Sequence, residues 1–223
     1  MKKLMSTLTG MLLMTFPATI HVHLLPYIEQ DNLYKSYLTQ QGGGGSGNAI
    51  VSSFNSPSDE STQNQAGVQN LAANLRVFSG HGFNTRYDAV LPPLAKVGPG
   101  PEASIRDIGD GTSNTIAFAT KYAVCGEGGS LYAAAPSSPF AAFVGQNPAA
   151  KPAHPSDATA TFQLRPGQQD CLVSPLLAQS FGTSGLSVAL LDGSVRMIDP
   201  TMSAETWNRA MQPNDGLKMG TDW

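Results

Sequence analysis

The sequence predicts an α+β fold in which an N-terminal helix packs on an antiparallel β-sheet. Three observations support this prediction. An amphipathic segment follows Pro26, and two apolar β-type runs are joined by Asp192-Gly193 near the C-terminal end. The 223 residues include only 13% charged side chains but 23 Gly and 16 Pro, which is typical of a loop-rich domain with β-structure and untypical of a helical bundle.

Chain length and charge limit the classes of function. A chain of this size buries about 70% of its unfolded surface when it folds, so it can form a core without a ligand. The net charge of −3 offers no basic surface for nucleic acid. We expect one domain over residues 19–223, preceded by a leader over residues 1–18.

The first 18 residues have the pattern of an export signal. Met1-Lys2-Lys3 is basic, and the stretch from Leu4 to Phe16 is mostly apolar. This stretch is shorter than the roughly 20 residues of a bilayer-spanning helix. We therefore expect the protein outside the cytoplasm, in the periplasm, on the cell surface or secreted.

The next segment predicts a strand or extended entry and then a helix. Residues Ile20–Leu25 are apolar and partly β-branched, and Pro26 suits the first turn of a helix that runs to about Leu38. We expect this helix to pack on the sheet through one face, formed by Ile28, Leu33, Tyr34, Tyr37 and Leu38. The run Gly42–Gly47 predicts a flexible loop or a low-complexity insertion.

The middle of the chain predicts strands separated by long loops. The polar segment Asn55–Gln65 predicts an exposed loop, and Leu75–Phe78 predicts a strand. His81–Pro101 is rich in Gly and Pro and predicts an irregular excursion.

A second strand and a second long insertion follow. Thr115–Tyr122 predicts a strand with Ile116, Phe118 and Thr120 on one face. Gly126–Gln169 predicts another insertion, with one strand at Thr161–Leu164.

The C-terminal part predicts a hairpin and a helix. Asp192-Gly193 between the β-type runs of Ser187–Ile198 predicts a two-residue type I′ turn. Ser203 is the expected N-cap of a helix over Ala204–Met211, which Pro213 ends. Trp207 and Met211 share one helix face, and we expect them to pack in the core.

The two cysteines, Cys125 and Cys171, predict a disulfide, because an exported domain meets an oxidising compartment. The alternative is a pair of buried free thiols. The two cysteines are not in C-x-x-C spacing, so the sequence does not indicate a redox motif.

No catalytic pattern emerges from the sequence, and we expect no enzyme activity. Gly182-Thr183-Ser184-Gly185 lacks the G-x-S-x-G spacing of a nucleophile elbow and predicts a loop that leads into a strand. His21 and His23 would share one face of a strand, where packing or surface positions are favoured over a metal site. His81 and His154 are expected to face solvent.

The best candidate cation ligands are Asp107, Asp110 and Asn114. Carboxylate and amide oxygens around a glycine turn are the ligands that calcium prefers, and extracellular loops bind it weakly. The favoured alternative is that Asp110 and Asn114 form hydrogen bonds within their own turn. Calcium is the only cofactor that the sequence suggests.

Three segments resemble one known family. Leu24–Tyr34 reads LLPYIEQDNLY, residues Asp110, Gly111, Thr112, Ser113, Asn114 and Thr115 read DGTSNT, and Asp192-Gly193 lies in the hairpin. In this order they resemble the prepilin-type processing-associated H-X9-DG family, a domain of unknown function also grouped with bacterial solute-binding proteins. Ten residues before Asp192, where the family signature has histidine, this chain has Gly182.

The resemblance implies a pilin-like fold with long Gly/Pro-rich insertions, and a pseudopilin-like structural or surface protein. Its partners would be subunits of a pilus-like or secretion assembly, or copies of itself. The family's N-terminal pilin helix is not matched, since no Glu follows Gly10 at the fifth position and the apolar run ends at Pro17. Residues 1–18 are therefore either a leader or a degenerate or truncated pilin N-terminus.

A second function class stays open from the sequence. The chain could be a secreted module that binds a solute, a glycan or a peptide between its long loops. Trp207, Tyr132 or Phe140 would then stack on the ligand.

Overall fold

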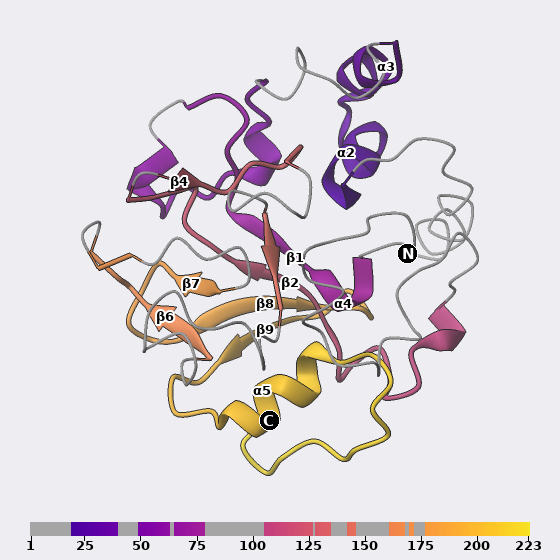
Figure 1. Cartoon of the computed structure of the whole chain (residues 1–223), viewed down its shortest axis with the longest axis vertical. Helices are drawn as coiled ribbons and strands as arrows, with labels where there is room; N and C mark the ends of the chain where they lie inside the picture. Colours follow the sequence, from indigo (N-terminus) through magenta and orange to yellow (C-terminus); the bar gives the residue numbers. More distant parts are fainter. Residues whose placement is uncertain are drawn as a thin grey trace.

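The computed structural model describes residues 19–39, 49–62, 65–78, 105–126, 128–134, 142–145, 161–167, 170–171 and 177–223. These residues form an α+β structure, as the sequence predicts. Figure 1 shows the strands in the middle of the molecule, with helices α2 and α3 on one side and α5 on the other. The predicted loop at Gly42–Gly47, together with His81, His154 and Phe140, lies outside the described residues.

A five-stranded sheet with the order β5-β1-β2-β8-β9 forms the centre. Its neighbouring strands are antiparallel, except that β5 runs parallel to β1. The strands are β1 (Leu71–Asn74), β2 (Ile116–Thr120), β5 (Phe143–Val144), β8 (Leu186–Leu190) and β9 (Val195–Ile198). The sequence did not predict β5, because its two residues are too few to show an alternating pattern.

Two small sheets lie beside the main sheet. Strands β3 (Val124–Cys125) and β4 (Gly128–Gly129) form an antiparallel pair. Strands β6 (Phe162–Leu164) and β7 (Ala178–Ser180) form a parallel pair, which confirms the strand predicted near Thr161–Leu164.

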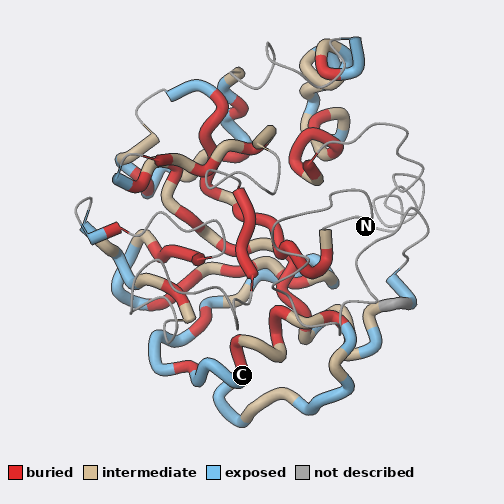
Figure 2. The backbone as a smooth tube through the Cα atoms, viewed as in Figure 1, coloured by how far each residue is buried: buried red, intermediate tan, exposed pale blue. Residues whose placement is uncertain are grey.

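Helix α5 (Ala204–Met211) covers one face of the main sheet. Ser203 caps it as predicted, since the serine hydroxyl accepts a hydrogen bond from the Thr206 N–H at 3.3 Å. Trp207 and Met211 are 4% and 0% exposed, so their predicted place in the core is confirmed. Figure 2 shows buried residues in the central strands and in helices α2 and α5. Each such large apolar side chain stabilises the fold by about 1.5–3 kcal/mol.

The N-terminal segment covers the opposite face. The prediction of a strand over Ile20–Leu25 is wrong, because Ile20–Leu24 forms helix α2. The Thr19 side chain caps this helix by accepting a hydrogen bond from the Val22 N–H. The His21 imidazole reaches the sheet, where its Nε2 donates to the Leu71 carbonyl oxygen at 2.7 Å. Aromatic rings of Phe54, Phe118 and Phe143 surround the imidazole at centroid distances of 5.7–6.3 Å.

The single helix predicted over Pro26–Leu38 is divided in two. A 3-10 helix, η1, spans Leu25–Ile28, and helix α3 spans Asp31–Thr39. Glu29 lies between them with φ of 63°, a left-handed conformation that ends the first segment.

Helix α3 packs against a second cluster of buried side chains, and helix α2 contacts the sheet in its place. Tyr37 is buried as predicted, but Leu38 is 43% exposed. The cluster against which α3 packs consists of Val22, Leu25, Tyr37, Val51, Phe54 and Tyr132, and we call it the N-terminal cluster.

Strand β1 lies one strand length earlier than predicted. The predicted strand Leu75–Phe78 is a single helical turn, α4, and β1 ends at Asn74. The Asn74 side chain explains the change, because its Oδ1 accepts the Arg76 N–H at 2.9 Å. Its Nδ2 donates to the carbonyl oxygens of Ile116 and Met211 at 2.7 and 3.0 Å.

Strand β2 is confirmed at Ile116–Thr120, but its predicted face is wrong. The register to β8 shifts between Ile116 and Phe118, so two steps along β2 match one step along β8. Such a bulge reverses the side-chain alternation. Ile116 therefore packs under α5, whereas Phe118 packs with Ala73 and Phe143 on the other face.

The predicted hairpin is confirmed, but its turn type is not. Strands β8 and β9 pair from Leu186↔Ile198 to Ala189↔Val195, and the Leu190 N–H donates to the Ser194 carbonyl oxygen at 2.9 Å. The loop therefore has three residues. Of these, Gly193 has φ of 87° and Asp192 does not have a positive φ, as in a turn followed by a glycine bulge.

The burial of His21 predicts a pH-dependent stability. Burial lowers the pKa of His21 to about 4, against a smaller rise from its hydrogen bond to Leu71. Between pH 6.5 and 4 the unfolded chain therefore binds a proton that the folded chain excludes. The free energy of unfolding should fall by about 3 kcal/mol as the pH drops through this window.

Urea unfolding between pH 7.5 and 4 measures this effect. The variant His21→Phe keeps an aromatic ring in the same place but cannot bind a proton. We expect a shallower pH dependence in the variant than in the natural chain. An identical pH dependence in the two proteins would contradict the assignment.

None of the helices in the described segments is both long enough and apolar enough to cross a membrane.

Candidate functional site

The segment Asp110–Thr115, which the sequence singled out, lies against the tip of the β8–β9 hairpin. The Leu191 N–H donates to the Thr115 carbonyl oxygen at 3.0 Å. The Asp192 N–H donates to the Thr112 carbonyl oxygen at 3.2 Å. The two motifs are 80 positions apart in sequence, and the fold joins them through their backbones.

Asp110 connects the same segment to the C-terminal tail. Its Oδ2 accepts the Asp215 N–H at 2.6 Å, and its Oδ1 accepts the Gly216 N–H at 2.8 Å. The Asp110 N–H donates to the Pro213 carbonyl oxygen at 3.3 Å. Asp110–Thr115 therefore holds the hairpin tip and the tail together, and we call this arrangement the motif junction.

Further hydrogen bonds hold the turn of the motif junction. Asn114 Nδ2 donates to the Asp110 carbonyl oxygen at 2.9 Å, and the Thr115 hydroxyl donates to the Gly111 carbonyl oxygen at 3.1 Å. Gly111 has φ of 95°, which glycine adopts without strain. Ser113 is exposed.

The calcium site predicted at Asp107, Asp110 and Asn114 stays a prediction. Both carboxylate oxygens of Asp110 accept backbone N–H groups, and the Asp107 side chain lies outside the described part of the chain. Burial raises the pKa of Asp215, the hydrogen bond from the Leu217 N–H opposes the rise, and the nearby Asp110 carboxylate adds to it. Within the described residues, no three His, Cys, Asp or Glu side chains are placed to hold a metal ion.

Asp192 and Gly182 lie at opposite ends of strand β8. The Asp192 carboxylate accepts hydrogen bonds from the N–H and hydroxyl of Ser194, at 2.9 and 2.6 Å, within the hairpin loop. Gly182 lies in the loop before β8, and nothing lies within 4 Å of a Cβ placed there. A five-residue strand spans about 16 Å, so side chains at the two positions do not share one site.

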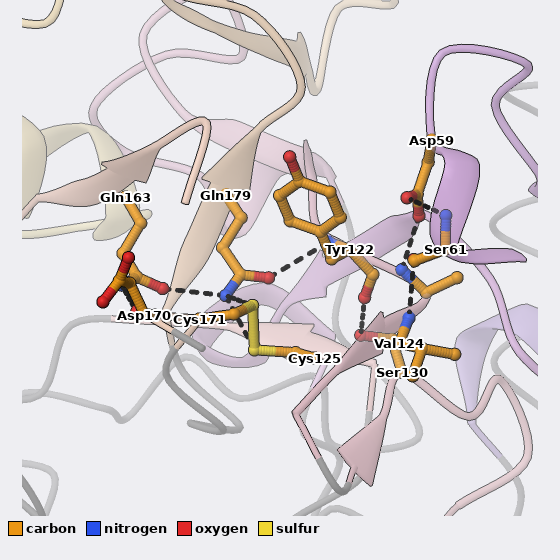
Figure 3. The surroundings of a disulfide bond; sticks show 11 residues. Asp59, Ser61, Tyr122, Val124, Cys125, Ser130, Gln163, Asp170, Cys171 and Gln179 are labelled. Atoms are coloured by element: carbon orange, nitrogen blue, oxygen red, sulfur yellow. Dashed lines mark hydrogen bonds between the residues drawn. A yellow bond between two sulfur atoms is a disulfide. The ribbon is translucent and has the colours of Figure 1, made fainter. Parts of the chain in front are cut away.

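Cys125 and Cys171 form the predicted disulfide, with Cα atoms 5.4 Å apart. It connects β3 to the segment between β6 and β7, and both cysteines are buried. Gln179 is fully buried beside it, and Figure 3 shows its side chain directed at the sulfur atoms. Its Nε2 donates to the Gln163 Oε1 at 2.9 Å and lies 3.1 Å from the Cys171 Sγ, while its Oε1 accepts the Tyr122 N–H at 3.1 Å.

Residues 15–205 match the model of a family described as a protein of unknown function (DUF1559). The chain belongs to this family. Neither the curated proteins nor the solved structures provide a match.

Sequence reasoning missed a buried carboxylate in this DUF1559 protein. Asp59 is 2% exposed, although the segment Asn55–Gln65 was predicted to be an exposed loop. Its Oδ1 accepts the Ser61 N–H at 2.9 Å, and its Oδ2 accepts the Ala123 N–H at 2.8 Å and the Asn70 Nδ2 at 2.5 Å. The polar run around Asp59 contains no signal that distinguishes this residue from its exposed neighbours.

Removing this carboxylate should destabilise the fold. We expect Asp59→Ala to lower the free energy of unfolding by about 3 kcal/mol, because three donors lose their acceptor in a buried place. The exposed neighbour provides a control, since Glu60→Ala should change stability by less than about 0.5 kcal/mol. Chemical denaturation measures both, and equal small effects would contradict the role of Asp59.

The aromatic and histidine candidates have packing roles where the structure describes them. Trp207 and Tyr132 are 4% and 0% exposed, so neither can stack on an external ligand in this conformation. His21 and His23 are buried on helix α2, which agrees with the favoured packing interpretation but not with a strand.

Proposed function

We propose that this DUF1559 protein is a non-enzymatic, pseudopilin-like structural component that works outside the cytoplasm. The motif junction is the observation that carries the proposal. Its polar groups form hydrogen bonds to backbone atoms of two distant segments, the hairpin tip and the C-terminal tail, which is the role expected of a structural motif. The finer placement in the prepilin-type H-X9-DG group rests on the same residues.

The disulfide supports the proposed location. Buried structural disulfides form and persist mainly in oxidising compartments, and are rare in the cytosol. The arrangement of helix α2 against a mostly antiparallel sheet supports the pilin-like part of the proposal. The proposed partners are subunits of a pilus-like or secretion assembly, or copies of this chain.

Cross-linking in intact source cells, followed by sedimentation and mass spectrometry, tests this function. We expect the protein to sediment as a complex much larger than the 23.4 kDa chain. Its cross-linked neighbours should carry pilin-type N-terminal segments or be copies of itself. A monomer that a carbohydrate or peptide stabilises saturably would contradict the proposal and favour a binding module.

A further inference from the structure

Arg76 is a buried cation at one end of the main sheet. It belongs to the helical turn α4, directly after β1, and is only 3% exposed. The Asn74 side chain fixes its backbone by accepting the Arg76 N–H at 2.9 Å. Asn74 is itself held by the carbonyl oxygens of Ile116 and Met211, so the position of Arg76 is set by the sheet and by α5.

Two nitrogens of this guanidinium have no hydrogen-bond partner among the described residues. Nε and Nη2 are shielded from solvent, and neither donates a hydrogen bond within the part of the chain that the structure describes. These two atoms lie on the same edge of the planar group, and their N–H bonds point in parallel. This edge is the one that binds carboxylate or phosphate oxygens in a bidentate manner.

The charge of Arg76 is not balanced by an ion pair in the described part of the chain. The two ion pairs found there join Lys35 to Asp31 and Arg209 to Glu205. Burial lowers the pKa of Arg76, but a guanidinium remains protonated in proteins at neutral pH. An uncompensated buried charge strongly destabilises a fold, so an anion would relieve an existing penalty.

Arg76 lies just beyond one end of the main sheet. Strands β1 and β5 run parallel and pair through Asn74 and Val144, so their carboxyl ends meet where α4 begins.

We propose that Arg76 is the cationic centre of a binding site for a small oxyanion, which the Nε and Nη2 atoms hold by paired hydrogen bonds. The ligand class is a carboxylate or phosphate group, free or as part of a larger solute. The site is separate from the motif junction and does not depend on the proposed structural function.

Thermal unfolding of the full chain at constant ionic strength tests the site, with acetate and phosphate as separate probes and chloride as the background ion. We expect a saturable rise in Tm of about 3 °C when one of the probes is tenfold above its Kd. A response to acetate alone assigns a carboxylate ligand, and a response to phosphate alone assigns a phosphate ligand.

Two variants separate this site from general salt effects. Arg76→Met should abolish the saturable rise and should raise Tm in buffer without the probes, because it removes the uncompensated charge. Arg106→Met makes the same change at an exposed arginine and should leave the titration unchanged. If Arg76→Met does not fold, the arginine Nε–H resonances of the natural chain give the same answer, since one of them should shift with the probe at the same Kd.

Two results would overturn the proposal. The first is that neither probe gives a saturable response in the natural chain. The second is a saturable response that persists in Arg76→Met. If the first result comes with a loss of stability in Arg76→Met, an acidic side chain of the protein itself balances Arg76.

Discussion

Replacing both cysteines by serine is expected to lower the free energy of unfolding by about 4 kcal/mol, as the chain-entropy model gives for a loop of this length. The disulfide joins residues 46 positions apart, so it restricts a large part of the unfolded chain. In the folded state it also holds β3 beside the β6–β7 pair, where the buried Gln179 contacts both sulfur atoms. The variant therefore loses a constraint on the unfolded chain and a packing partner in the folded one.

Equilibrium unfolding in urea measures this loss. The natural chain with its disulfide reduced and its thiols blocked provides a second form without the cross-link, and it should lose a similar amount. A loss below about 1 kcal/mol in both forms would show that the Cys125–Cys171 bond does not support the fold, since removal of native disulfides typically costs 2–5 kcal/mol.

Gly185→Ala should destabilise the fold by about 4 kcal/mol, because backbone strain and a steric clash act together. Gly185 has φ of 142°, a conformation that residues with a side chain rarely adopt. A Cβ at this position would lie 2.3 Å from the Ile198 carbonyl oxygen, in the neighbouring strand β9. Either β9 or the start of β8 must shift to make room.

Gly182→Ala is the matched control for this prediction. The same loop contains both glycines, but position 182 has open space around a Cβ and no positive φ. We expect its stability to change by no more than about 0.5 kcal/mol. Similar denaturation midpoints for the two variants would contradict the strained geometry at Gly185.

Local sequence signals were sufficient to predict an element where capping or turn residues fix its boundary. Helix α5 was predicted to the residue, because Ser203 caps it and Pro213 follows its end. The hairpin was also predicted from a local signal, the Asp192-Gly193 pair between two β-type runs. Its loop length was not, because a two-residue turn and a three-residue turn with a bulge both place glycine after aspartate.

Other elements depend on contacts that the sequence pattern does not reveal. Leu75–Phe78 has the composition of a strand, but the Asn74 side chain binds the Arg76 N–H and turns the chain into a helix. The alternation along β2 fails at a bulge set by β8.

The motif junction was predictable only in part. Asp110–Thr115 and Asp192-Gly193 were singled out by resemblance, and the structure brings them together. Asp215 was not predicted as a partner of Asp110, since 105 positions separate them and only the folded tail brings them into contact. The buried charges of Asp59 and Arg76 also carry no local signal, because burial follows from tertiary packing.

The central claim is that Asp110 and its turn hold the C-terminal tail in place. Amide hydrogen exchange in Asp110→Ala tests it most directly, because this change removes the acceptors of the Asp215 and Gly216 N–H groups. We expect exchange at Asp215 and Gly216 to accelerate about tenfold or more as this part of the tail opens locally, while the control Ser113→Ala keeps the natural rate. Unchanged protection of these two amides in Asp110→Ala would contradict the account.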